Sequence, residues 1–231
     1  MSGRETPVER GAVTNVLAVD TATEVLALGL SRGSARAALC LRRGLQHSPA
    51  LLPLVSMLLD QLGMKAEDLH LVVCSLGPGS FTGIRIGLAT ALGISGATGL
   101  PVVGVSTLDA LAEPWRESDR DIFPVIDARK GKIYTARFRA GRRQTEYLDL
   151  TPRALVEALG AADRPLLIGP DSERIRGMLG DDAAATAVAD LFDPAALLRL
   201  GVETYRTEGA DPARLRPLYL RKSEAEIASG L

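Results

Sequence analysis

Histidine, cysteine and aromatic side chains are all scarce in this sequence. Its 231 residues include two histidines, two cysteines and one tryptophan, and aromatic residues make up only 4%. Single-stranded nucleic acids bind largely by stacking on aromatic side chains, so this chain offers few stacking platforms. The formal net charge of −1 also supplies no bulk attraction for a polyanion. The composition therefore does not indicate direct nucleic-acid binding, and only a local basic patch would allow it.

The sequence also lacks the features of a secreted or membrane-spanning chain. Residues 1–15 are polar and have no apolar core of the kind found in signal peptides. No apolar run approaches the roughly 20 residues that cross a bilayer. Cys40 and Cys74 lie far apart and form no CxxC pair. We expect a cytoplasmic protein in which both thiols are reduced and buried.

What the sequence does contain is a regular succession of apolar runs and turn signals. Hydrophobic residues make up 46% and charged residues 24%, which is typical of a globular protein with a packed core. In the first half, the pattern predicts a meander of three antiparallel strands followed by alternating helices and strands. The predicted strands are Val16–Val19, Val25–Leu30, Ala37–Leu41, Leu71–Ser75 and Pro101–Val105. The predicted helices are Pro49–Leu62, one from about Gly83 to Ala97, and one that starts near Leu108.

The second half repeats the opening of the first in a weaker form. Phe123–Ile126 is an apolar strand followed by Asp127, and a short turn leads into an alternating strand, Lys132–Phe138. The same order of strand, aspartate, turn and strand begins at Val16. The remaining predicted elements are a strand at Leu166–Ile168 and helices at Thr151–Leu159, from Asp171 and from Asp193. Two related α/β halves of this kind indicate a duplication, with a cleft between the halves.

The most distinctive segment is GPGSFTGIRIG at positions 77–87. Together with several shorter blocks, it resembles the TsaB (YeaZ-type) family. The blocks occur in the order of that family and extend from about Val16 to Arg221. They are LAVDTAT at 17–23, His47-Ser48 before Leu51-Leu52-Pro53, GVSTL at 104–108, IDAR at 126–129 and PLYLR at 217–221.

This resemblance implies an α/β protein with the duplicated fold of actin, sugar kinases and Hsp70, called the ASKHA fold. Two domains are expected, each with a mixed sheet flanked by helices. On this basis residues 1–14 form a flexible tail, residues 15–107 the N-terminal domain and residues 108–212 the C-terminal domain. Residues 213–231 are expected to form a C-terminal tail that packs back on the N-terminal domain.

The resemblance also implies a function. The related enzyme TsaD uses a carbamoyl-adenylate donor to modify adenosine 37 of tRNA to threonylcarbamoyladenosine, and a small ATPase, TsaE, joins the assembly. We therefore expect a non-catalytic partner of a TsaD-like enzyme, which also meets a TsaE-like ATPase and has a homodimer as a competing assembly. The alternative hypothesis is an ATP-binding kinase or ATPase of the same fold. A peptidase is disfavoured, because the sequence has no HExxH motif and no convincing Ser/His/Asp set.

The residues themselves argue against catalysis. Catalytic relatives hold a metal with two histidines four residues apart on one helix, a spacing that lets both reach one ion. His47 and His70 are too far apart for this arrangement. We therefore expect no catalytic residue and no metal site.

The turns that hold phosphate in this fold are also altered. The first turn, Asp20–Glu24, has no glycine to let backbone N–H groups approach a phosphate, and Glu24 would repel one if it faced the cleft. The second turn has Gly131 among basic residues, which fits an anion site or, in our preferred interpretation, a solvated hairpin. At the third element, Gly169 is followed by a proline and an acid. We expect no cofactor, except for a nucleotide held at a subunit interface.

Asp20 and Asp127 follow corresponding strands of the two halves. They either form a carboxylate pair across the cleft, as an active kinase would require, or cap their own turns by accepting backbone N–H bonds. Capping is the interpretation that we favour.

Small residues recur every four positions after the GPGSFTG segment. Gly83, Gly87, Ala91 and Ser95 would form a smooth stripe that lets another backbone approach closely. Each glycine inside a helix costs about 0.8–1 kcal/mol relative to alanine, so a compensating contact is expected. That contact is either the chain's own sheet or a second subunit, and the family resemblance favours the subunit. The predicted partner interface comprises Gly79, Thr82, Gly83, Ile86, Gly87, Thr90, Ala91, Leu51, Val55 and Leu58.

Overall fold

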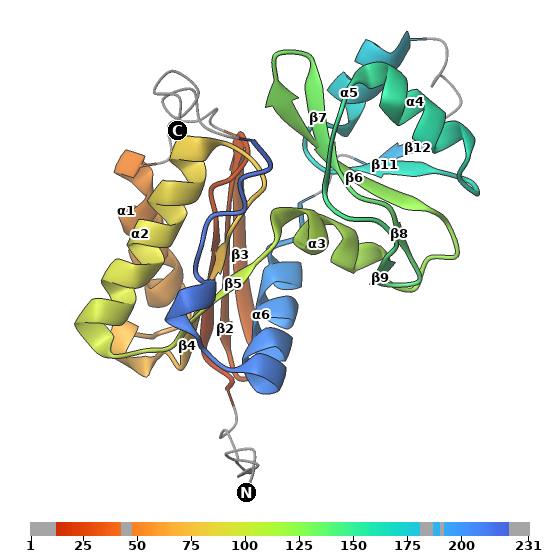
Figure 1. The fold of residues 1–231 in the computed structure, drawn as a ribbon. Helices are drawn as coiled ribbons and strands as arrows, with labels where there is room; N and C mark the ends of the chain where they lie inside the picture. Colours follow the sequence, from red (N-terminus) through yellow and green to blue (C-terminus); the bar gives the residue numbers. More distant parts are fainter. Residues whose placement is uncertain (1–12, 43–47, 181–186, 190–191, 222–231) are drawn as a thin grey trace, which may run out of the picture.

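The computed structural model describes residues 13–42, 48–180, 187–189 and 192–221, which form two α/β units side by side (Figure 1). The first unit contains β1 (Val16–Asp20), β2 (Val25–Arg32), β3 (Ala35–Arg42), α1 (Ser48–Gln61), β4 (Leu71–Ser75), α2 (Phe81–Thr98) and β5 (Val102–Val105). The short helix α3 (Thr107–Ala112) leads to the second unit. That unit contains β6 (Ile122–Arg129), β7 (Lys132–Thr135), β8 (Phe138–Arg139), β9 (Arg142–Arg143), β10 (Leu148–Leu150), α4 (Pro152–Gly160), β11 (Leu166–Ile168), α5 (Ser172–Leu179) and β12 (Ala187–Ala189), and α6 (Pro194–Glu208) follows it.

The two sheets have the same topology. Their strand orders are β3-β2-β1-β4-β5 and β10-β7-β6-β11-β12. In each sheet the first strand of the unit lies at the centre, pairs antiparallel with the next strand, and pairs parallel with a strand that comes after a helix. The predicted duplicated α/β fold is therefore confirmed, and the hairpin β8–β9 is an addition to the second unit. The prediction of one strand over Lys132–Phe138 is wrong, because β7 ends at Thr135 and Phe138 pairs with Ile122 of β6.

Alternation along the central strand β1 places apolar side chains on both faces of the first sheet. Leu17 and Val19 pack under α1, whereas Val16 and Ala18 pack towards α6. Helix α6 comes after the second unit in sequence but lies on the first sheet, and its Gly201 sits so close to β4 that a Cβ atom there would be 2.2 Å from Val73 Cγ2. The predicted domain boundaries remain predictions. Residues 1–12 of the predicted N-terminal tail, residues 222–231 of the predicted C-terminal tail and His47 lie outside the described residues.

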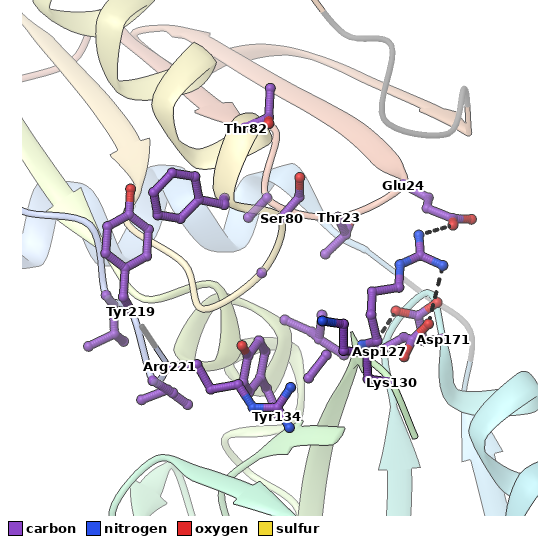
Figure 2. A pocket seen from close by; sticks show the side chains of 18 of the residues that line it. Thr23, Glu24, Ser80, Thr82, Asp127, Lys130, Tyr134, Asp171, Tyr219 and Arg221 are labelled. Carbon is purple, nitrogen blue, oxygen red and sulfur yellow. Dashed lines mark hydrogen bonds and ion pairs between the residues drawn. The ribbon is translucent and has the colours of Figure 1, made fainter. Parts of the chain in front are cut away.

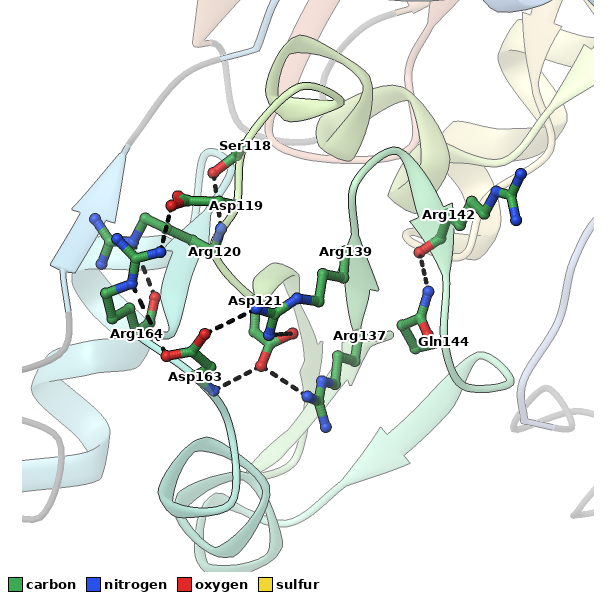
Figure 3. A network of polar contacts seen from close by, with 10 residues as sticks. All are labelled: Ser118, Asp119, Arg120, Asp121, Arg137, Arg139, Arg142, Gln144, Asp163 and Arg164. Carbon is green, nitrogen blue, oxygen red and sulfur yellow. Dashed lines mark hydrogen bonds and ion pairs between the residues drawn. The ribbon is translucent and has the colours of Figure 1, made fainter.

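Helices α4 and α5 cover the outer face of the second sheet with a separate apolar cluster. At the end of this sheet away from the cleft, the buried carboxylate of Asp121 accepts hydrogen bonds from the Arg137 guanidinium at 2.7 Å and from the Asp163 N–H at 2.6 Å (Figure 3). Burial alone would raise the pKa of Asp121, but these partners bring it below its ordinary value. The network ties the start of β6 to the strands and loops around it. Among the described residues, we find no helix long and apolar enough to span a membrane.

The glycines at the start of α2 face the turn between β1 and β2. A Cβ atom on Gly79 would lie 2.2 Å from the Ala22 carbonyl oxygen, and one on Gly83 would lie 2.0 Å from the Thr21 carbonyl oxygen. A Cβ atom on Gly87 would lie 2.5 Å from Thr21 Oγ1. The interpretation of these glycines as a docking stripe for a second subunit is therefore wrong. The contact that they allow is with the chain's own first turn.

This contact makes the effect of alanine depend on its position in α2. We expect Gly83→Ala to destabilise the protein by about 1–3 kcal/mol or more, because the new methyl group overlaps a backbone carbonyl. Gly93 is exposed, and a Cβ atom there would meet no neighbouring element of the described chain within 4 Å. Gly93→Ala should therefore stabilise the protein by about 0.4–1 kcal/mol. Urea denaturation measures both changes, and equal effects at the two positions would contradict the inward orientation of Gly83.

Candidate functional site

A cavity of about 630 Å³ lies between the two units, where β1 and β6 end (Figure 2). Its walls are the β1–β2 turn, the start of α2, the β6–β7 turn, the start of α5 and the C-terminal segment 218–221. This volume is in the range of small-molecule sites. The predicted cleft between the halves therefore exists, and its chemistry depends on how the polar groups around it are engaged.

Asp20 is fully buried and caps its own turn. Its Oδ1 accepts the N–H of Ala22 at 2.7 Å, and its Oδ2 accepts the hydroxyl of Thr107 at 3.2 Å. Thr23 continues this pattern, since its Oγ1 accepts the N–H of Val25 at 3.1 Å. These N–H groups of the first turn point to partners within the chain, so they are not directed at a phosphate in the cleft.

Asp127 has the equivalent role in the second unit. Its Oδ1 accepts the N–H of Arg129 at 2.8 Å, and its Oδ2 pairs with the guanidinium of Arg174 at 2.7 Å. The favoured interpretation of Asp20 and Asp127 as turn caps is thus confirmed. Their carboxylates are engaged with groups of their own units.

A chain of ion pairs crosses the side of the cavity formed by the β6–β7 turn (Figure 2). Glu24 pairs with Arg129 at 2.7 Å, and Arg129 also lies 3.3 Å from Asp127. Asp171 pairs with Arg174 at 2.7 Å and accepts the N–H of Asp127 at 2.9 Å. Asp171 and Asp127 together raise the pKa of Arg174. Glu24 therefore does face the cleft, and the glycine-proline-acid element places Asp171 where it neutralises an arginine.

The C-terminal segment forms another wall of the cavity. The Leu218 N–H donates to the Leu76 carbonyl at 2.6 Å, and the Tyr219 ring stacks on Phe81 with the ring centroids 4.5 Å apart. Arg85 lies over the Phe81 ring and donates to the Tyr219 hydroxyl at 3.0 Å. The sequence showed the 217–221 block only as part of the resemblance. Nothing in its spacing indicates a contact with residues more than 130 positions earlier.

Arg221 extends the same segment to the second unit, where its guanidinium pairs with Asp149 of β10. A further contact between the units is the hydrogen bond from the Arg42 guanidinium of β3 to the Pro170 carbonyl at 3.1 Å. The two units are therefore joined by side chains around the cleft as well as by the chain crossings at α3 and α6.

The predicted interface residues divide by face. Leu51, Val55 and Leu58 lie on the buried face of α1, and Gly83, Gly87 and Ala91 lie on the buried face of α2. Gly79, Ile86 and Thr90 are half-buried, and Thr82 is exposed. Whether these helices form an interface stays a prediction, but most of the residues chosen for it lie on the inward faces.

The outward faces of the same helices carry different apolar residues. Leu52 and Met57 of α1 are 59% and 41% exposed, and Leu92 of α2 is 45% exposed. A groove of about 360 Å³ lies between α1, the segment that follows it and Ile94 of α2, and Leu52 is the exposed residue that lines it. The predicted helices therefore present an apolar surface to solvent, at positions that the spacing of small residues does not indicate.

The two cysteines and His70 belong to the first unit. Cys74 is buried, but the prediction of a buried thiol is wrong for Cys40, which is exposed on β3 at the edge of the first sheet. Both cysteines are free. His70 is exposed and its Nδ1 accepts the N–H of Thr14 at 3.4 Å. Within the described part of the chain, no group of three or more His, Cys, Asp or Glu side chains has a metal-binding arrangement.

Comparison with known proteins agrees with the fold. Residues 44–162 match the family model described as TsaD, tRNA N6-adenosine threonylcarbamoyltransferase. The tRNA threonylcarbamoyladenosine biosynthesis protein TsaB of Bacillus subtilis is 33% identical over 224 residues, which cover 91% of this chain and 96% of the relative. The Escherichia coli protein of the same name is 38% identical over 128 residues, 53% of this chain and 54% of the relative.

A solved structure from Pseudomonas aeruginosa, described as an uncharacterized protein with similarity to peptidase YEAZ, superposes with a TM-score of 0.75. It is 29% identical, and the match covers 90% of this chain and 100% of that one. Fold, cleft and matches define a duplicated α/β protein related to the threonylcarbamoyltransferases. Within that class, the chain belongs to the TsaB (YeaZ-type) family.

The state of Asp20 gives a prediction about pH. Burial raises the pKa of Asp20 from its ordinary value of 3.8 to about 6, although its hydrogen bonds lower it in part. Between these pH values the folded state binds more protons than the unfolded state, so this carboxyl lowers stability as pH rises, by roughly 3 kcal/mol in total. Asp20→Asn cannot ionise and keeps an oxygen for the Ala22 N–H.

We therefore expect Asp20→Asn to gain stability relative to the wild type as pH rises from 4 to 7, as measured by urea denaturation at each pH. Asp20→Ala, which loses the cap, should be less stable than Asp20→Asn throughout this range. A constant difference between the wild type and Asp20→Asn would mean that Asp20 titrates normally.

Proposed function

We propose that this chain takes part in forming threonylcarbamoyladenosine on tRNA as the non-catalytic partner of a TsaD-type enzyme. Membership of the TsaB family and the match to the TsaD family model support the pathway. The observation that carries the non-catalytic role is that Asp20, Asp127 and Asp171, the acids of the cleft region, are engaged in turn caps and ion pairs within the chain.

The cleft also offers little to a nucleotide. Glu24 places a negative charge beside the position that a phosphate would need, and the Ala22 N–H is directed at Asp20. No nucleotide cofactor is therefore expected in the cleft of this chain, and a nucleotide would bind only where two subunits meet. The competing hypothesis of a kinase or ATPase requires Asp20 to be available, whereas it is fully buried.

The partner surface is the outward face of α1 and α2. Its exposed large apolar side chains are Leu52, which lines the groove, together with Met57 of α1 and Leu92 of α2. Exposed large apolar side chains and an adjacent groove are typical of protein interfaces. The same surface would serve a TsaD-type enzyme or a second copy of this chain, so the two assemblies would compete. A TsaE-type ATPase is the expected third component.

Reconstitution tests the proposal. The purified chain alone should not modify tRNA, and adding it to a TsaD-type enzyme and a TsaE-type ATPase should raise the rate of threonylcarbamoyladenosine formation at least tenfold. Equal rates with and without the chain would refute the partner role. Calorimetric titration with Mg-ATP distinguishes the partner role from the kinase or ATPase alternative. Micromolar binding with turnover by the isolated chain would establish an enzyme.

A charged residue on the outward face tests the surface. Leu92→Glu should weaken binding to the TsaD-type enzyme at least tenfold, because complex formation would bury an unpaired charge. Met178→Glu is the matched control, since Met178 is 43% exposed but lies on α5 of the second unit. Both variants should keep the stability of the wild type. Unchanged affinity of Leu92→Glu in a titration would exclude this face from the interface.

A further inference from the structure

Glu24 and Arg129 form an ion pair between the two units, across the mouth of the cleft. Glu24 follows β1 in the first unit, and Arg129 ends β6 in the second; their charged atoms are 2.7 Å apart. Both side chains are partly exposed, at 34% and 55%. An exposed pair of this kind adds little to stability. Its position in the cavity wall is therefore the more informative property.

The backbone of the second turn holds Arg129 in an uncommon conformation. Arg129 has φ 61°, and Lys130 and Gly131 continue the left-handed run with φ 52° and 68°. Arg129 pairs with Lys132 next to a register shift in the β6–β7 ladder. Positive φ at the two central residues, here Lys130 and Gly131, is what a tight hairpin turn requires, whereas the positive φ of Arg129 accompanies the register shift. The bulge places Arg129 where it pairs with the opposite unit.

Each arginine of the cavity wall already has a carboxylate partner from the chain. Arg129 is paired with Glu24 and Asp127, Arg174 with Asp127 and Asp171, and Arg221 with Asp149. A guanidinium presents the same forked donors to a carboxylate and to a phosphoryl group. The chain's own acids therefore occupy the groups with which this cleft would bind a phosphate.

Among these acids, Glu24 is the one that reaches across from the first unit. Asp127 caps its own turn and Asp171 is nearly buried, so both belong to the framework of the second unit. Within the described residues, Glu24 is ion-paired with Arg129 alone, so its charge can be removed without uncapping the Asp127 turn.

We propose that Glu24 is a built-in anion that occupies the Arg129 site and keeps phosphoryl anions out of the cleft. Removal of its charge would leave Arg129 paired, among the described residues, with Asp127, beside a cavity that Ser80 also lines. The cleft would then bind a phosphoryl anion such as inorganic pyrophosphate. The blocked site is thus a latent anion site, and Glu24 is the contact that inhibits it.

Calorimetric titration with inorganic pyrophosphate at low ionic strength tests this proposal on the full chain. Glu24→Gln should bind pyrophosphate at least tenfold more tightly than the wild type. Glu24→Ala, which removes the charge without adding an amide, should show the same gain and serves if the glutamine variant folds poorly. Glu24→Gln combined with Arg129→Gln should return to the wild-type affinity.

The matched control is Glu146→Gln. It removes the same charge from a side chain that is 93% exposed, lies 3.9 Å from Arg143 and does not line the cavity. This variant should bind pyrophosphate as weakly as the wild type. The proposal is overturned if neither Glu24 variant binds more tightly, if Glu146→Gln gains as much, or if the double variant keeps the gain.

Discussion

The close contact between the start of α2 and the β1–β2 turn is the constraint on which the rest of the cleft depends. Gly79 and Gly83 let the helix approach the carbonyl groups of Thr21 and Ala22. Two hydrogen bonds fix this approach, from the Ser80 N–H to the Ala22 carbonyl at 2.7 Å and from the Thr21 hydroxyl to the Gly83 carbonyl at 2.7 Å. The cost of glycine in a helix is offset here within one chain. The turn is thereby held against α2, and Asp20 accepts the Ala22 N–H at 2.7 Å.

The helices and strands can be predicted from the sequence, whereas the neighbour that these glycines contact cannot. Strands and helices follow from the period of apolar residues, and the repeated strand–Asp–turn–strand order correctly indicated two sheets of one topology. The stripe of small residues was also correctly located. The direction in which the stripe points does not follow from the sequence. Periodicity shows that a helix has a smooth face, but not which neighbour lies against that face. Leu51, Val55 and Leu58 were misplaced for the same reason, since a core stripe and an interface stripe have identical spacing.

The parts of the site that the sequence left undetermined are contacts between distant positions. The stack of Phe81 on Tyr219 and the pairing of Arg221 with Asp149 join segments that no local pattern relates. The ion pair of Glu24 with Arg129 is of the same kind, although the sequence did indicate that an acid stood where a phosphate would bind. Side-chain chemistry can thus be predicted at a position, whereas its partner depends on tertiary structure.

The side-chain contacts between the two units also affect how the units are held relative to each other. In a fold of two units around a cleft, a ligand that binds both units can change the angle between them, because its contacts differ between open and closed states. Here side chains of the chain itself make the connections: Glu24 with Arg129, Arg42 with the Pro170 carbonyl, and Arg221 with Asp149. With these contacts between the units made by the chain itself, no phosphate is required to fix the second unit relative to the first. Such pre-organisation lowers the cost of any later association, since affinity falls when an interface must first be ordered.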